Sequence, residues 1–190
     1  DYQRAVAQGF QGGNIAQFAS MPNYGGLTGT QAVVFVDNHD TQRSTPTLTY
    51  KNGDRYYLAD AFMMAHPYGT VQLMSSYAFT AQAQGPPSSA DGTSNATDCA
   101  NGQWVCEHRD ERVAGMPGFR NATEGTGVTG TVTDGNGRLG FARGGRGYAA
   151  FNATGDAWTR TFGTSLPDGT YCNVARGTFT AATGACTGGT

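Results

Sequence analysis

The residues best suited to chemistry are Asp37, Asn38, His39 and Asp40, which directly follow an apolar run ending at Val36. Together they present an amide, an imidazole and two carboxylates. The imidazole offers directional hydrogen bonds to hydroxyl groups, and Asp40 offers a fixed negative charge that can stabilise a cationic, oxocarbenium-like transition state. The alternative is structural, because Asp37 can cap the loop and His39 can satisfy backbone groups. The residue types alone leave both interpretations open.

A βαβ unit is expected to position these side chains. Residues 32–36 are a continuous apolar, β-branched run, which is typical of a strand buried on both faces. Residues 55–65 carry apolar side chains at helical spacing, with Asp54 as the expected cap and a proline shortly after the end. Residues 70–74 are a second strand candidate after the polar loop that runs through position 52. Because ligands bind where the carboxyl ends of parallel strands emerge, residues 37–40 lie at a candidate site.

Near residue 122 the predicted secondary structure changes from alternating strands and helices to short strands alone. Residues 83–101 form a loop rich in Gly, Pro, Ser and Asp, and residues 104–116 return to a modest helical pattern. Further on, short alternating runs predict strands at residues 139–143, 148–152, 171–175 and 178–181. The first two of these flank Gly-Gly-Arg-Gly, which predicts a hairpin. The first thirty residues have only weak periodicity, and no element is predicted there.

A match to a dinucleotide-binding pattern, formed by Gly135, Gly137 and Gly140, is rejected on its context. Such a site needs a helix directly after the glycines, so that the helix N-terminus faces the pyrophosphate. The residues that follow are Phe-Ala-Arg-Gly-Gly, which cannot begin a stable helix. A hairpin turn is predicted instead.

Composition and cysteine spacing exclude several classes of protein. A net charge of −2 with 14% charged residues provides no basic surface for nucleic acid, and no apolar run is long enough for a membrane span. The spacing of the four cysteines does not fit a zinc site. Four cysteines allow three connectivities, of which proximity favours Cys99–Cys106 and Cys172–Cys186. Disulfides indicate an oxidising compartment, and secretion is therefore expected.

Residues 35–40, Phe-Val-Asp-Asn-His-Asp, resemble the fourth conserved region of the α-amylase family of glycoside hydrolases. Further blocks resemble the branch of that family that includes the chloride-dependent α-amylases, at residues 65–69, 74–77, 104–109, 118–121, 141–148 and 166–172. The resemblance implies that residues 1–121 are the C-terminal portion of a catalytic (β/α)8 TIM barrel. Residues 122–190 then correspond to an incomplete antiparallel Greek-key β-sandwich domain.

The resemblance also implies endo-hydrolysis of α-1,4-glucosidic bonds in starch, glycogen and malto-oligosaccharides, with retention of configuration. Asp40 matches the carboxylate that stabilises the transition state, and His39 matches a histidine that binds the sugar hydroxyls at the cleaved bond. The family's nucleophile motif, G-x-R-x-D, is missing here, and residues 1–34 contain no Glu for the acid/base role. A complete barrel also needs about 250 residues. We therefore expect this segment alone to be inactive. Its parent protein is expected to be an enzyme of this family that acts as a monomer.

Cofactor expectations follow from the same resemblance. The family's structural calcium is bound nearer the start of the barrel, so no metal ligand is assigned in this chain. In chloride-dependent relatives the residue matching Asn38 and a basic residue bind chloride, but Gln72 stands at the basic position here. A neutral amide carries no charge, so the affinity for chloride is expected to fall or vanish. The cysteine pairs also match disulfides of the family.

Aromatic residues near the catalytic strand could stack on sugar rings, because aromatic faces suit the apolar faces of pyranoses. Core and helix packing is favoured for Tyr56 and Tyr57. For Tyr50, packing and sugar stacking are equally favoured.

A second class of function stays open, namely a non-catalytic glucan-binding or interaction module derived from an α-amylase. The flanking coding sequence discriminates between the two. An upstream stretch with the missing Asp and Glu motifs favours the enzyme, whereas a start codon and signal peptide directly before Asp1 favour the module.

Overall fold

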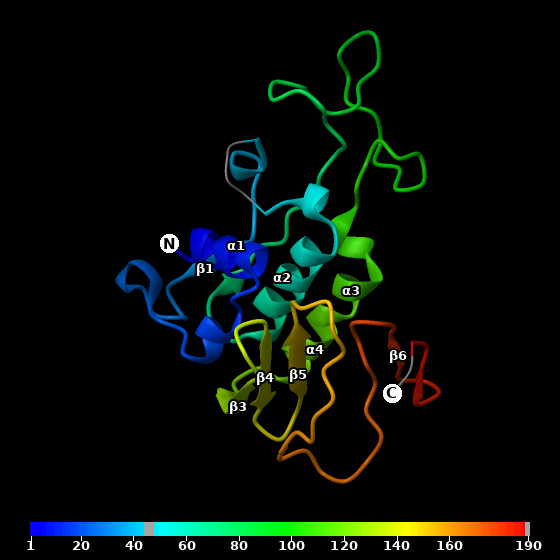
Figure 1. Cartoon of the computed structure of the whole chain (residues 1–190). Coiled ribbons are helices and arrows are strands. Elements are labelled where there is room, and N and C mark those ends of the chain that lie inside the picture. Colours follow the sequence, from blue (N-terminus) through cyan, green and yellow to red (C-terminus); the bar gives the residue numbers. More distant parts are fainter. Residues whose placement is uncertain (44–47, 189–190) are drawn as a thin grey trace.

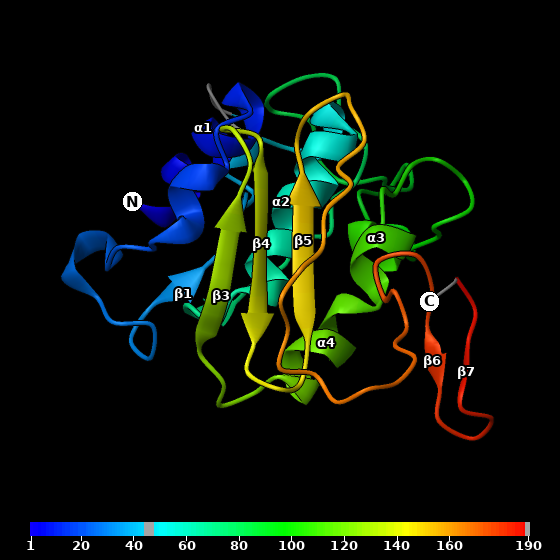
Figure 2. The same cartoon turned by 60° about the horizontal axis from the view of Figure 1, so that its bottom comes forward.

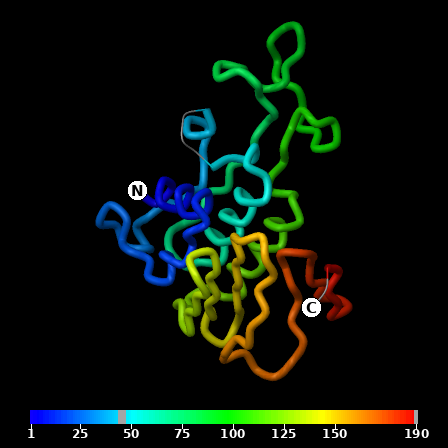
Figure 3. Tube along the Cα trace, viewed as in Figure 1, coloured from blue at the N-terminus to red at the C-terminus, as the bar shows by residue number. Residues whose placement is uncertain are grey.

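The computed structural model describes residues 1–43 and 48–188, so residues 44–47 of the predicted polar loop lie outside the described residues (Figures 1 and 3). The α-helices are α1 (Tyr2–Gly12), α2 (Asp54–Ala65), α3 (Glu111–Ala114) and α4 (Met116–Ala122). The 3₁₀ helices are η1 (Ala16–Ala19), η2 (Tyr24–Gly26), η3 (Thr41–Arg43), η4 (Tyr50–Asn52) and η5 (Glu107–Arg109). The strands are β1 (Val33–Val34), β2 (Thr70–Val71), β3 (Val128–Thr133), β4 (Arg138–Arg143), β5 (Tyr148–Asn152), β6 (Phe179–Thr180) and β7 (Ala185–Cys186). Within the described ranges, no helix has the length and hydrophobicity needed to cross a bilayer.

Strands β1 and β2 pair in parallel, with α2 between them in the chain, so the predicted βαβ unit is confirmed. Both strands are shorter than the sequence predicts, with two residues each. The expectation that β1 is buried on both faces is wrong, because Val34 is 1% exposed while Val33 is 54% exposed. A sheet buries its second face only where another layer covers it, and the described residues place no such layer over Val33.

Helix α2 confirms the predicted helix, but its start differs from the expectation. Gly53 is the N-cap, with a φ of 58° that favours glycine, and Asp54 is the first helical residue rather than the cap. The Asp54 carboxylate instead accepts a hydrogen bond from Arg112 at 2.5 Å. The helix ends at Ala65 as predicted, because the residue before Pro67 avoids the helical conformation.

The β part is an antiparallel sheet in the order β3–β4–β5, with α2 packed behind it (Figure 2). The turn at residues 144–147 joins β4 to β5, which confirms the predicted hairpin. Gly140 lies inside β4 and no helix follows it, in agreement with the rejection of a dinucleotide site. The strand predicted at residues 171–175 is wrong, since the chain there has no regular structure.

The helical stretch predicted at residues 104–116 begins later and continues further than expected. Trp104 forms an isolated antiparallel bridge with Tyr77, and the helical residues are those of η5, α3 and α4. Helix α1 was not predicted at all. The strand prediction likewise left out β3.

One hydrophobic core joins the helices to the sheet, with the Phe62 ring of α2 at its centre. The centroid of this ring lies 5.5 Å from that of Phe10, 5.1 Å from Phe18 and 5.6 Å from Phe151. These partners come from α1, η1 and β5 respectively. The core thus contains residues from both sides of residue 121. The division of the chain into domains 1–121 and 122–190 stays a prediction.

His66, which follows α2, is a buried titratable residue of this core. Burial and the positive charges of Arg143 and Arg120 lower its pKa to about 4. In the neutral form its Nδ1 accepts a hydrogen bond from the backbone N–H of Tyr68 at 3.2 Å. Protonation of His66 removes this acceptor and places a third positive charge beside Arg120 and Arg143.

We expect acid to destabilise the fold through His66. The pKa of His66 in the folded chain, about 4, lies below the unfolded value of 6.5. The stability that neutral His66 contributes is therefore present above pH 6.5, and it falls by about 3 kcal/mol as the pH is lowered towards 4. The free energy of unfolding by urea is measured at pH 7 and pH 4 for the unsubstituted chain and for His66→Gln. The loss is the part of the pH dependence that the substitution removes. Other groups, including Asp37, titrate equally in both. Parallel pH profiles of the two proteins would contradict the prediction.

Candidate active site

The candidate site is a tight turn that follows β1. The Asn38 Oδ1 atom accepts hydrogen bonds from the backbone N–H groups of Asp40 at 3.0 Å and Thr41 at 2.8 Å. The chain then enters η3, where the Gln42 backbone N–H donates to the Asn38 carbonyl at 2.9 Å. The turn lies on the side of the molecule where the long segment between β2 and η5 projects (Figure 1).

This turn presents His39 and Asp40 to solvent. Their side chains are 79% and 83% exposed, and the His39 Nε2 atom lies 3.6 Å from the Asp40 Oδ1 atom. The exposure of the His39 side chain does not favour the purely structural interpretation, in which the ring satisfies backbone groups. An exposed imidazole and carboxylate this close together can contact the same small ring of a ligand. The particular roles assigned to them from the sequence stay predictions.

Asp37 is the buried anchor of the turn rather than a loop cap. Its Oδ1 atom accepts a hydrogen bond from the Tyr56 hydroxyl at 3.0 Å, and its Oδ2 atom accepts one from the Gln42 side chain at 2.8 Å. Burial raises the pKa of Asp37 to about 6, with a further contribution from the negative charge of Glu107, while the two hydrogen bonds oppose the rise. Asp37 thus connects the end of β1 to α2 and to η3.

Three further polar residues in this region were missed by sequence reasoning: Gln42, Ser76 and Glu107. The Gln42 Nε2 atom also donates to the Ser76 hydroxyl, and the Ser76 backbone N–H donates to Glu107 Oε2 at 2.7 Å. Ser76 and Glu107 occur in sequence blocks that resemble the α-amylase family, but nothing in their spacing indicates that they meet the turn.

Arg43 holds the segment of residues 79–84 against the same turn. Its guanidinium carbon lies 4.2 Å from the Phe79 ring centroid, and its Nη1 atom donates to the Gln84 carbonyl at 2.9 Å. The Tyr50 hydroxyl accepts a hydrogen bond from the backbone N–H of Phe79 at 3.2 Å. Tyr50 therefore has a packing role here, and its stacking on a sugar stays a prediction.

Tyr56 and Tyr57 lie in the core, as predicted for these two residues. They are 0% and 9% exposed. Their rings contact each other edge to face, with 5.3 Å between the centroids.

The structure also places the two residues considered for an anion. The Asn38 side-chain oxygen holds the turn, while the backbone N–H of the exposed Gln72 donates to the Val34 carbonyl at 2.8 Å. No hydrogen bond joins the side chains of Asn38 and Gln72 within residues 1–43 and 48–188. The weakness of chloride binding stays a prediction.

Calcium, the metal that the resemblance implies, does not fit the residues present. Among the described residues, no group of three or more His, Cys, Asp or Glu side chains is arranged to hold a metal ion.

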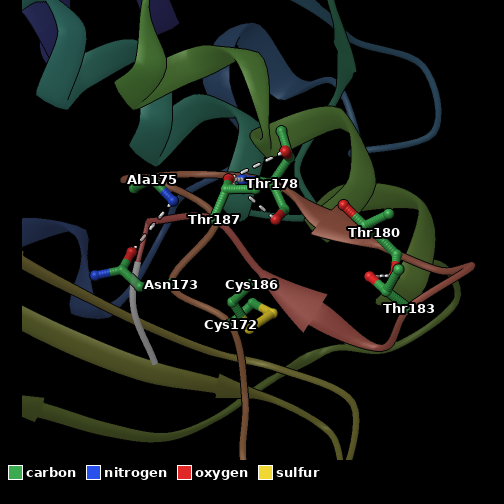
Figure 4. Close-up of a disulfide and its surroundings, with 8 residues drawn as sticks. All are labelled: Cys172, Asn173, Ala175, Thr178, Thr180, Thr183, Cys186 and Thr187. Atoms are coloured by element: carbon green, nitrogen blue, oxygen red, sulfur yellow. Dashed lines mark hydrogen bonds between the residues drawn. A yellow bond between two sulfur atoms is a disulfide. The ribbon is translucent and has the colours of Figure 1, made fainter.

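Both predicted disulfides are confirmed. Cys99 pairs with Cys106 and Cys172 pairs with Cys186, with Cα atoms 5.7 Å and 5.4 Å apart. Figure 4 shows the second disulfide tying the segment at Cys172 to β7, beside the hydrogen bonds between Thr178 and Thr187. The first disulfide ends at the residue before Glu107, next to the candidate site.

Comparison with known proteins decides the relationship of the chain. Residues 131–190 match the family model described as Alpha amylase, C-terminal all-beta domain. The chain is 57% identical to an α-amylase of Thermomonospora curvata, over 94% of this chain and 29% of that protein. It is 46% identical to an α-amylase of Tenebrio molitor, over 99% of this chain and 42% of that protein. The chain is a relative of the α-amylases and corresponds to their C-terminal part.

Solved α-amylase structures agree with this relationship. The chain superposes on the crystal structure of α-amylase I from Eisenia fetida with a TM-score of 0.87 and 33% identity, over 93% of this chain and 39% of that one. A variant of the same α-amylase in complex with maltohexaose matches equally well, with a TM-score of 0.87. The chain thus spans less than half of the length of each of these α-amylases.

Proposed function

We propose that the chain is part of an α-amylase that hydrolyses internal α-1,4-glucosidic bonds of starch and glycogen with retention of configuration. The observation that carries the proposal is the 57% identity to an α-amylase along 94% of the chain. The βαβ unit of β1, α2 and β2 is then one unit of a (β/α)8 barrel, and the antiparallel sheet belongs to the Greek-key β-domain. The exposed turn at the end of β1 lies where barrel enzymes bind their substrates.

Asp40 and His39 have distinct roles in this proposal. The Asp40 carboxylate stabilises the positive charge that develops on the sugar in an oxocarbenium-like transition state. The imidazole of His39, 3.6 Å away, hydrogen-bonds the hydroxyl groups of the same sugar ring. A retaining mechanism also needs a nucleophile and an acid/base about 5–5.5 Å apart, which residues outside this chain supply.

The proposal includes the conditions under which the protein works. Its partners are α-glucans, malto-oligosaccharides among them, and it acts as a monomer. The two disulfides favour an oxidising, extracellular compartment. Calcium is held by parts of the barrel beyond this chain, and a neutral Gln72 in place of a cation leaves activity independent of chloride.

The test compares the whole protein, expressed from its complete coding sequence, with the 190-residue chain. In halide-free buffer we expect the whole protein to release reducing sugar from starch and to gain nothing from added chloride. The chain alone should release none, because it lacks a nucleophile and an acid/base. If the whole protein binds starch without cleaving it, the non-catalytic module is the correct function.

A further inference from the structure

Gln42 is a buried amide between two segments that are distant in sequence. It is 8% exposed and lies two residues after Asp40, in η3. Its Nε2 atom donates one hydrogen bond to Asp37 Oδ2, at 2.8 Å, and one to the Ser76 hydroxyl. Since an amide nitrogen carries two hydrogens, both donors of Gln42 are used.

The Ser76 end of this connection is fixed in turn by Glu107. The Glu107 side chain is fully buried, and its Oε2 atom accepts from the Ser76 backbone N–H at 2.7 Å. Because the carboxyl oxygen is buried, water does not compete for this hydrogen bond. Glu107 also directly follows Cys106, which the disulfide to Cys99 holds in place. The series Glu107, Ser76, Gln42 therefore runs from a covalently restrained segment to the turn.

The exposed side chains of the turn have no comparable anchor of their own. Asp40 projects into solvent, and its partner among the described side chains is His39 at 3.6 Å. Its position relative to a ligand therefore depends on how firmly the backbone of the turn is held. The local hydrogen bonds of Asn38 shape the turn, and among the described residues Gln42 is the one whose side-chain amide joins it to both Asp37 and Ser76.

We propose that Gln42 is the positioning residue of the candidate active site, and that Glu107 anchors it through Ser76 so that Asp40 is held in the orientation that catalysis requires. This inference rests on the proposed function. Because a displacement of about 1 Å can cost 10²-fold in rate, residues that position a charge can matter nearly as much as the charge itself.

The central test is Gln42→Glu in the whole protein. Glutamate has the shape of glutamine but lacks both donors, and it puts a carboxylate against Asp37. We expect kcat on starch to fall between about 10-fold and 100-fold, with a smaller change in KM. Hydrogen exchange at the Asp40 and Thr41 amides should become faster. The matched control is Gln103→Glu, the same substitution at an exposed position, which should change neither.

A pair of Glu107 variants tests the anchor. Glu107→Leu removes the acceptor for the Ser76 N–H, so it should lower kcat and accelerate exchange in the turn. Glu107→Gln keeps an acceptor oxygen, so most of both effects should be reversed. A general loss of packing would not be rescued by restoring one oxygen atom.

A double-mutant cycle separates this proposal from the proposed function. If Gln42 acts through Asp40, Gln42→Glu should have little further effect on kcat in an Asp40→Asn background. The proposal is overturned if kcat and exchange are unchanged in Gln42→Glu, or if its full effect persists without the Asp40 charge. If Asp40→Asn alone keeps normal turnover, the catalytic assignment fails, and faster exchange in Gln42→Glu then shows a purely structural anchor.

Discussion

Replacement of Asp40 by Asn is expected to lower kcat of the whole protein about 100-fold or more. The substitution keeps the size of the side chain and removes its charge. Since the Asp40 side chain is 83% exposed, the change leaves no buried group without a partner and should not disturb folding. The loss falls on the transition state, where positive charge develops on the sugar, so kcat and kcat/KM should decrease together.

Initial rates on soluble starch over a range of concentrations measure this effect. Asp168→Asn provides the control, because it makes the same substitution at an exposed position in the β part. An unchanged urea midpoint in Asp40→Asn would show that the fold is intact. Turnover close to that of the parent protein would remove Asp40 from the catalytic machinery.

Replacement of Phe62 by Ala is expected to lower the free energy of unfolding of the chain by about 3–5 kcal/mol. Phe62 is fully buried, and its ring packs against the rings of Phe10 in α1 and Phe151 in β5. Truncation removes these contacts and leaves a cavity where the helical part of the chain meets the antiparallel sheet. The two parts are therefore expected to lose stability together, in one transition.

Urea unfolding followed by far-ultraviolet circular dichroism and by tryptophan fluorescence measures this loss. Phe179→Ala is the matched control, because Phe179 is 56% exposed and its truncation should cost no more than about 0.5 kcal/mol. Two separate transitions, with only one of them shifted, would show instead that the helical part and the sheet unfold independently.

Much of the local structure could be predicted because it depends on residues close together in sequence. Helical spacing and a following proline predicted α2, and alternating runs around Gly-Gly-Arg-Gly predicted the β4–β5 hairpin. Short separations likewise predicted both disulfides. Each of these features is decided by propensities and distances within a few turns of chain.

Other elements could not be predicted, because a distant segment decides their form. Helix α1 contains Gly9 and Gly12, which weaken a helical pattern, yet the Phe18 ring packs so closely on Gly9 that an added Cβ would lie 2.7 Å from it. Asp54 was expected to cap α2, but it pairs with Arg112 from α3. In both cases the partner comes from another part of the fold.

The candidate site likewise has features that the sequence predicts and features that depend on distant segments. The sequence by itself determined that His39 and Asp40 follow a strand, and the family resemblance assigned them a chemistry. Only the tertiary structure decided that Gln42, Ser76 and Glu107 meet beneath them, through hydrogen bonds that join residues 34 and 31 positions apart. The physical reason is that a local pattern reports which side chains emerge from a strand, whereas their orientation depends on buried polar groups that only the folded chain brings together.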